Sequence, residues 1–247
     1  MKIENNQQLW ALYLGMLSFL GNKLDMDVLK KHKKIWKLIK NQEYELPEAI
    51  IYGAPEVELH LLKNSQVNII QNFVEQKHGI KNSNRFFDEV DRLIEGSGFT
   101  REASREIQRI KLLSNAYINE ILNDKNNKAK KEKYETIFRN IDSVTSSGLY
   151  AYDLANAISL CRLGGVYGYL NKEEVLEKVN NIAGIIYDKY YNYEDFGVAC
   201  RLGYELEVLK LKDNNAKIDR LDQHSVMNQV GYNIWTKLPW PREFNIM

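Results

Sequence analysis

The sequence has few of the residues that interrupt helices or build covalent and metal sites. Its 247 residues include four prolines, fourteen glycines, two cysteines and four histidines. Cys161 and Cys200 are too few for a disulfide framework and do not form a CxxC pair, which favours a reduced setting. The histidines are scattered, with no HExxH motif and no pair at i, i+4. We therefore expect no metal site and no other cofactor.

An excess of charge of one sign is also missing. The 34 basic and 33 acidic residues leave a formal charge of +1, too small to attract nucleic acid or an anionic membrane over long distances. The N-terminal apolar run follows acidic and amide residues, has no small-residue cleavage site and is interrupted by Gly15 and Ser18. This run is also too short to span a bilayer. These features predict a cytoplasmic protein with no membrane partner.

Apolar residues recur at every third or fourth position along most of the chain, which is the period of an α-helix. Asn171 and Glu174 have the spacing of a capping box before one such stripe, and Thr100 has the character of an N-cap before another. The pattern predicts an all-α fold, with residues 1–247 in a single domain of about eight helices. A lysine-rich surface connection is expected near residues 124–133.

The stretch NIWTKLPW predicts an extended tail, because Pro239 excludes a regular helix. Trp235 and Trp240 on this tail would either cover the domain or reach a partner. We expect them to pack against the domain, since an indole removes a large apolar area from water.

Two charged residues stand in the otherwise apolar stretch YAYDLANAISLCRLGGVYGYL. Asp153 and Arg162 are nine residues apart, which places them on opposite sides of a helix, so they cannot pair with each other. Arg201 on a later helix is the expected partner of Asp153. The three residues form a candidate polar cluster. We interpret Asp153 and its partner in this cluster as a buried structural pair. The alternative is an enzyme with a polar pocket between the central helices.

Two surfaces are candidates for binding other molecules. The first is a tyrosine group, which is either an interaction surface or a helix junction: Tyr187, Tyr190, Tyr191 and Tyr193. The second is a lysine-rich amphipathic helix, which is typical of a solvated face and only weakly indicates nucleic-acid binding: Lys30, Lys31, Lys33, Lys34, Lys37 and Lys40.

Five segments of the chain together carry a resemblance to a known family: WALYLGMLSFLGNKLDMDVL, KHGIKNSNRFFDEVDRLIEGSG, AYDLANAISLCRLGGVYGYLNKEEV, YYNYEDFGVACRLGYELEVL and NIWTKLPW. In this order they resemble the bacterial domain of unknown function 1266 family. The first segment is similar to the family's first helix, the third resembles its central signature, and the other three look like further family segments. The chain departs from the pattern at His78, Asn156 and the pair Asn192 and Tyr193. The resemblance implies a fold and no established activity.

No catalytic signature occurs in the sequence. GGVYG lacks the GxxxxGK[ST] pattern of a phosphate loop, and no GxSxG element is present. We therefore expect a non-enzymatic protein-binding module whose partner is another protein. A toxin-neutralising immunity protein is one form that such a module takes.

Overall fold

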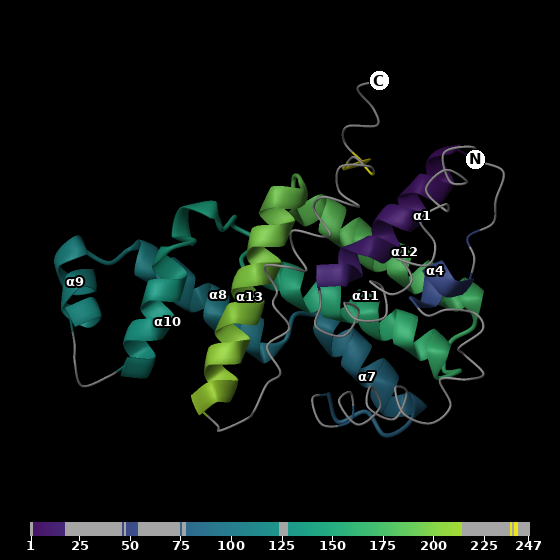
Figure 1. Cartoon of the computed structure of the whole chain (residues 1–247), viewed down its shortest axis with the longest axis horizontal. Helices are drawn as coiled ribbons and strands as arrows, with labels where there is room; N and C mark the ends of the chain where they lie inside the picture. The colour runs from purple at the N-terminus through teal and green to yellow at the C-terminus, as the bar shows by residue number, and fades with distance from the viewer. Residues whose placement is uncertain are drawn as a thin grey trace.

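The protein is described by a computed structural model. The residues that the structure describes are 2–17, 46, 48–53, 75, 78–123, 128–213, 238 and 240–241. All regular elements in these residues are helical, which confirms the predicted all-α class (Figure 1). The helices are α1 (Lys2–Leu14), α4 (Glu48–Tyr52), α7 (Ser83–Ile94), α8 (Gly98–Lys111), α9 (Asn115–Asn123), α10 (Lys128–Phe138), α11 (Tyr150–Val166), α12 (Lys172–Lys189) and α13 (Tyr193–Asp213). Two short 3₁₀ turns, η1 (Gly15–Leu17) and η2 (Ile141–Ser143), complete the set of elements in the described ranges.

Helix α11 lies at the centre of the fold. It packs against α7, α12, α13 and η1, and every residue from Ala151 to Gly164 is buried. A helix that is apolar on all sides is stable only when other helices surround it. Gly164 allows one of these contacts, because a Cβ at this position would run into the ring of Phe86. The helix ends in a turn at Gly168, whose φ of 75° suits glycine.

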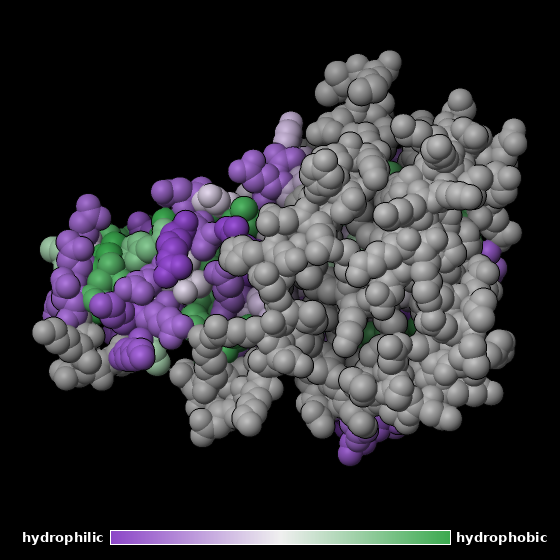
Figure 2. All heavy atoms as spheres, viewed as in Figure 1, coloured by the Kyte–Doolittle hydropathy of each residue, from purple (hydrophilic) through white to green (hydrophobic). Residues whose placement is uncertain are grey.

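A second, smaller core lies where α8, α10 and α13 meet. Its buried residues include Ile107 from α8, Ile137 from α10 and Leu202 and Leu206 from α13. Helix α9 packs on α10, so these two helices extend the molecule at one end of its long axis (Figure 1). On this side, hydrophobic residues are visible among the hydrophilic ones (Figure 2).

Local capping explains where several helices begin. Asn171 and Glu174 form the predicted capping box at the start of α12, with both reciprocal hydrogen bonds present. The N-cap of α8 is Ser97, because its hydroxyl accepts a hydrogen bond from the amide of Thr100. Thr100 was the predicted N-cap, and this assignment is wrong by one helical turn. The φ of 88° at Gly96 ends α7 and turns the chain toward Ser97.

The lysine-rich segment predicted to be a surface connection near 124–133 is helical from Lys128 onward. Its lysines and Ala129 are good helix formers, and the helix gains an i, i+4 pair between Lys131 and Glu135 at 3.9 Å. The first half of this helix is exposed or partly exposed, so its lysine-rich sequence looks the same as that of a solvated loop. The sequence pattern therefore did not reveal the helix. Residues 124–127 lie outside the described part of the chain.

The tail packs on the domain at its described residues, as predicted. Trp240 is 1% exposed, and its ring meets the rings of Trp10 and Tyr193 edge to face, each with centroids 5.1 Å apart. Leu238 is also buried, and its carbonyl accepts a hydrogen bond from the Tyr193 hydroxyl at 2.7 Å. Trp235 and the lysines of residues 30–40 lie outside the described residues.

Candidate functional site

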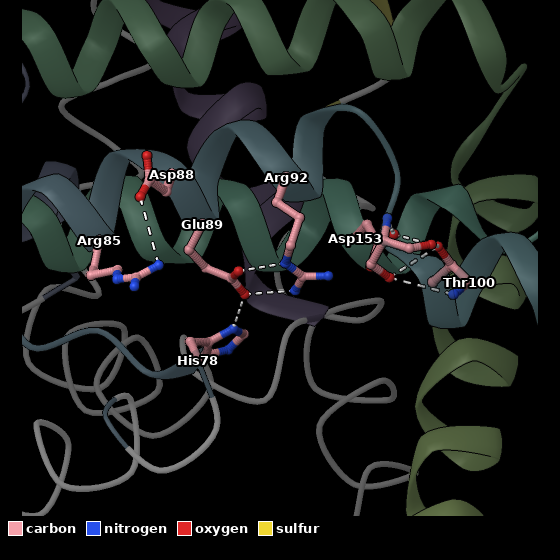
Figure 3. A network of polar contacts seen from close by, with 8 residues as sticks. His78, Arg85, Asp88, Glu89, Arg92, Thr100 and Asp153 are labelled. Atoms are coloured by element: carbon pink, nitrogen blue, oxygen red, sulfur yellow. Dashed lines mark hydrogen bonds and ion pairs between the residues drawn. The ribbon is translucent and has the colours of Figure 1, made fainter.

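Asp153 caps the N-terminus of α8 from the neighbouring helix α11 (Figure 3). Its carboxylate accepts hydrogen bonds from the Ser97 amide at 2.6 Å and the Ser97 hydroxyl at 2.9 Å, and a short one from the Thr100 hydroxyl. Burial raises the pKa of Asp153, and these hydrogen bonds offset only part of that effect. A carboxylate at a helix N-terminus satisfies free amide groups and interacts favourably with the helix dipole.

Arg162, near the other end of α11, binds the carbonyl ends of two helices. Its guanidinium donates to the carbonyls of Ile51 at 3.0 Å, Ile50 at 2.9 Å and Leu12 at 3.4 Å. These carbonyls belong to the last turns of α4 and α1, where helices leave C=O groups without intrahelical partners. A buried cation there stabilises both helix ends. Asp153 and Arg162 therefore both tie α11 to the ends of other helices.

The predicted pairing of Asp153 with Arg201 is wrong. Arg201 donates to the side chain of Asn140 at 2.6 Å and lies 3.9 Å from Glu205 on its own helix. The candidate cluster of Asp153, Arg162 and Arg201 is thus divided among three places, each with its own partners. Sequence spacing could show that these charges needed partners, but backbone atoms of distant helices were not foreseeable as those partners.

The tyrosine group is mostly a helix junction. Tyr190 is buried, accepts a hydrogen bond from the Ala151 amide at 2.7 Å and donates to the Gly148 carbonyl at 3.3 Å. Tyr193 holds the tail, and Tyr187 packs partly buried against the main core. Tyr191 alone of the four is largely exposed, at 67%. The four tyrosines therefore do not form one open surface.

A polar cluster that the sequence did not indicate lies on α7 (Figure 3). The buried carboxylate of Glu89 accepts hydrogen bonds from Nε and Nη2 of Arg92 at 2.5 and 2.7 Å. It also lies 2.5 Å from Nδ1 of His78. Burial by itself would raise the pKa of Glu89, but the hydrogen bonds from Arg92 and His78 and their charges lower it to about 2. The i, i+3 spacing of Glu89 and Arg92 was the available signal, whereas His78 is eleven residues away.

Neither cysteine has the character of a nucleophile. Cys161 and Cys200 are buried, and burial raises the pKa of Cys161 to about 12 and that of Cys200 well above its ordinary value. A thiol that stays protonated at neutral pH is unreactive. Both residues fill space in the main core.

An open groove of about 560 Å³ lies over the second core, between α8, α10 and α13. Apolar groups form much of its surface, among them Phe99, Tyr134, Leu206 and Leu209. Lysines border the rings: Lys210 lies 5.3 Å from the centre of Phe99, and Lys130 lies 5.9 Å from that of Tyr134. Its volume is within the range of known ligand sites.

An ion pair between Lys133 and Glu106 joins two walls of this groove, α10 and α8. Both side chains remain partly exposed, at 41% and 28%. The pair neutralises two of the charges that line the groove. The remaining lining combines apolar groups with cations and carboxylates.

The described residues thus define an all-helical protein with two adjoining cores and a groove over the smaller one. Residues 74–240 match the model of a family described as protein of unknown function (DUF1266). The chain belongs to this family. Comparisons with curated proteins and with solved structures gave no match.

Two further observations concern membranes and metals. No helix in the described ranges has both the length and the apolar composition needed to cross a bilayer. Within the same ranges, no three His, Cys, Asp or Glu side chains come together as metal ligands would.

Proposed function

We propose that the chain is a non-enzymatic module that binds another protein through the groove between α8, α10 and α13. The observation that carries this proposal is the groove itself, an apolar hollow bordered by charges on a face formed by three helices. An amphipathic helix placed in such a groove buries its apolar side and leaves its polar side in water. We place the protein in the cytoplasm, and a toxin-neutralising immunity protein is the specific form proposed.

The alternative of an enzyme with a polar pocket between the central helices has less support. Asp153 and Arg162, which would have acted in that pocket, are engaged with helix ends. The lysines of residues 30–40, which were candidates for nucleic-acid binding, lie outside the described residues. A second group of lysines is present in α10, where Lys133 is paired with Glu106.

Filling the groove with a large side chain tests this proposal. Ala129 lines the groove and is exposed, so Ala129→Trp should block the groove without disturbing the core. The matched control is Ala116→Trp, on the exposed surface of α9 away from the groove lining. Both variants should retain the circular dichroism and melting temperature of the unmodified protein.

Affinity capture from the native host then compares the three proteins. We expect the unmodified chain and Ala116→Trp to retain the same protein partner after nuclease treatment, and Ala129→Trp to retain about tenfold less. Equal capture by all three proteins would contradict binding in the groove. The immunity form further requires that the captured protein stop growth when expressed alone and not when co-expressed with this chain.

A further inference from the structure

The outer side of α8 carries three arginines on one face. Arg101, Arg105 and Arg109 follow one another at intervals of four residues, and all three are exposed. Four residues advance about 6 Å along a helix and return nearly to the same side. Leu112, three residues after Arg109, continues the same face. We call these four residues the arginine face.

Two of these arginines carry charges that have no ion-pair partner among the residues that the structure describes. Arg101 donates to the carbonyls of Glu95 and Gly96 at 3.2 and 3.1 Å, which fixes it over the end of α7. No side-chain hydrogen bond or ion pair joins the guanidinium of Arg105 or Arg109 to any other residue in the described ranges of the chain. Within the described part of the chain, no group accepts a hydrogen bond from their guanidinium donors, which can bind water or a partner.

One exposed apolar residue continues this face, and a second lies on the next helix, α9. Leu112 is 87% exposed and Tyr117, at the start of α9, is 47% exposed. Large apolar side chains with this exposure are uncommon in the described residues, where Tyr191 is the remaining example. Arginine, tyrosine and exposed apolar groups together are typical of surfaces that bind proteins.

We propose that the arginine face binds an acidic helix of a partner protein. Carboxylates repeating at every fourth residue of that helix have the same spacing of about 6 Å as the arginines, and guanidinium groups bind carboxylates in a matched, two-pronged geometry. An apolar residue near one end of the helix covers Leu112. The helix belongs to the protein that occupies the groove, so this assignment rests on the proposed function.

A nucleic acid fits this surface less well than an acidic helix does. Glu102 is exposed beside Arg101 and Arg105, and Glu106 beside Arg105 and Arg109 keeps 28% of its side chain exposed. These carboxylates would repel a continuous phosphate backbone, whereas discrete carboxylates on a helix can avoid them. A phosphate backbone also offers no apolar group for Leu112.

A defined peptide tests the arginine face without the natural partner. The probe is a dye-labelled synthetic peptide of about four helical turns, with glutamate at every fourth position and leucines beside them. A second peptide has glutamine in place of each glutamate. Fluorescence anisotropy at low salt measures the binding of both peptides to the full chain and to two double variants.

The test variant is Arg105→Glu with Arg109→Glu, and the matched control is Lys81→Glu with Arg85→Glu. The control side chains are 71% and 70% exposed and lie away from α8. Each double variant replaces two basic residues by two glutamates, so both change the net charge equally. We expect saturable binding of the glutamate peptide, about tenfold weaker for the test variant and changed less than about twofold for the control. The glutamine peptide should not bind.

Three results would overturn this assignment: no saturable binding of the glutamate peptide, equal binding of both peptides, or equal losses in both double variants. Tighter binding of mixed-sequence duplex DNA through the same two arginines would do so as well. Partner capture separates this assignment from the groove. Capture that Ala129→Trp abolishes and the arginine variant leaves intact would retain the groove and reject the arginine face, and the reverse result would reject the groove.

Discussion

Asp153 and Arg162 show how single buried charges can organise a helical core. The carboxylate serves the amide end of α8, and the guanidinium serves the carbonyl ends of α4 and α1. Each charge therefore faces the helix end with which its sign is compatible. The two residues connect α11 to three neighbours without forming an ion pair with each other.

Removing the Asp153 carboxylate should destabilise the protein. Asp153→Ala would leave the Ser97 amide and the hydroxyls of Ser97 and Thr100 without their acceptor, lowering the free energy of unfolding by on the order of 2 to 4 kcal/mol. Urea denaturation followed by circular dichroism measures this change. Asp88→Ala, at a side chain 71% exposed, is the control and should have little effect. Unchanged stability with loss of the captured partner would assign Asp153 to a binding site instead.

The lowered pKa of Glu89 predicts that the folded protein loses stability in acid. Its pKa of about 2 in the folded protein lies below the ordinary 4.5, so its stabilising effect is complete above that ordinary value and disappears as the pH falls toward 2. Between about pH 5 and pH 3, Glu89 should account for a loss of about 2 kcal/mol in the free energy of unfolding. Asp153 acts in the opposite direction, because its raised pKa makes protonation favour the folded state.

Chemical denaturation at the two pH values tests the contribution of Glu89. Glu89→Gln should reduce the difference in stability between them, while Glu177→Gln, at an exposed position of α12, should retain it. An unchanged pH dependence in Glu89→Gln would mean that other groups cause the acid sensitivity.

The sequence could predict that Asp153 and Arg162 are buried, because apolar residues surround both. It could not predict their partners. Ser97 is 56 residues from Asp153, and Ile51 is 111 residues from Arg162. The partners of Arg162 are also backbone carbonyls, which every residue possesses, so no residue type marks them.

At the level of helices, the sequence was informative where the signal is local. The capping box at Asn171 and Glu174 uses two side chains three residues apart, and it was correctly predicted. The start of α10 was missed, because its lysines indicate both a solvated loop and an exposed helix. The groove could not be foreseen, since it depends on how α8, α10 and α13 meet and on no repeated pattern within one helix.

The contact between α11 and α13 depends on a glycine. A Cβ at Gly203 would run into the side chain of Tyr152, so Gly203→Ala should lower the free energy of unfolding by about 1 to 3 kcal/mol. Gly184 in α12 is exposed with open space around it, and Gly184→Ala should stabilise the protein by up to about 1 kcal/mol. Thermal and urea denaturation of both variants measure the two changes. Equal effects of the same sign would contradict the close approach at Gly203.

On the scale of the whole molecule, residues outside the segment that matches the family model pack into the same core. The match covers residues 74–240, whereas Trp10, Leu12 and Ile50 precede it. Trp10 packs on Trp240, and the carbonyls of Leu12 and Ile50 accept hydrogen bonds from the Arg162 guanidinium. The core around α11 therefore includes α1 and α4 as integral parts.

The docked tail should contribute strongly to global stability. Trp240→Ala would leave a cavity among Trp10, Tyr193 and Phe196 and should lower the free energy of unfolding by about 3 to 5 kcal/mol. A lower melting temperature and increased binding of a hydrophobic dye would report the change. Tyr191→Ala is the exposed control and should alter neither measurement. A Trp240→Ala protein of unchanged stability that no longer captures its partner would make the tail a recognition element.

The contact between Trp10 and Trp240 also sets an order of events during synthesis. Ribosomes add about 5 to 20 residues per second, so α1 is made roughly ten seconds to a minute before Trp240 reaches it. During that interval, the side of Trp10 that Trp240 later covers is open to chaperones or to other nascent chains. Slower translation of the final helices would lengthen this exposure without changing any residue of the finished protein.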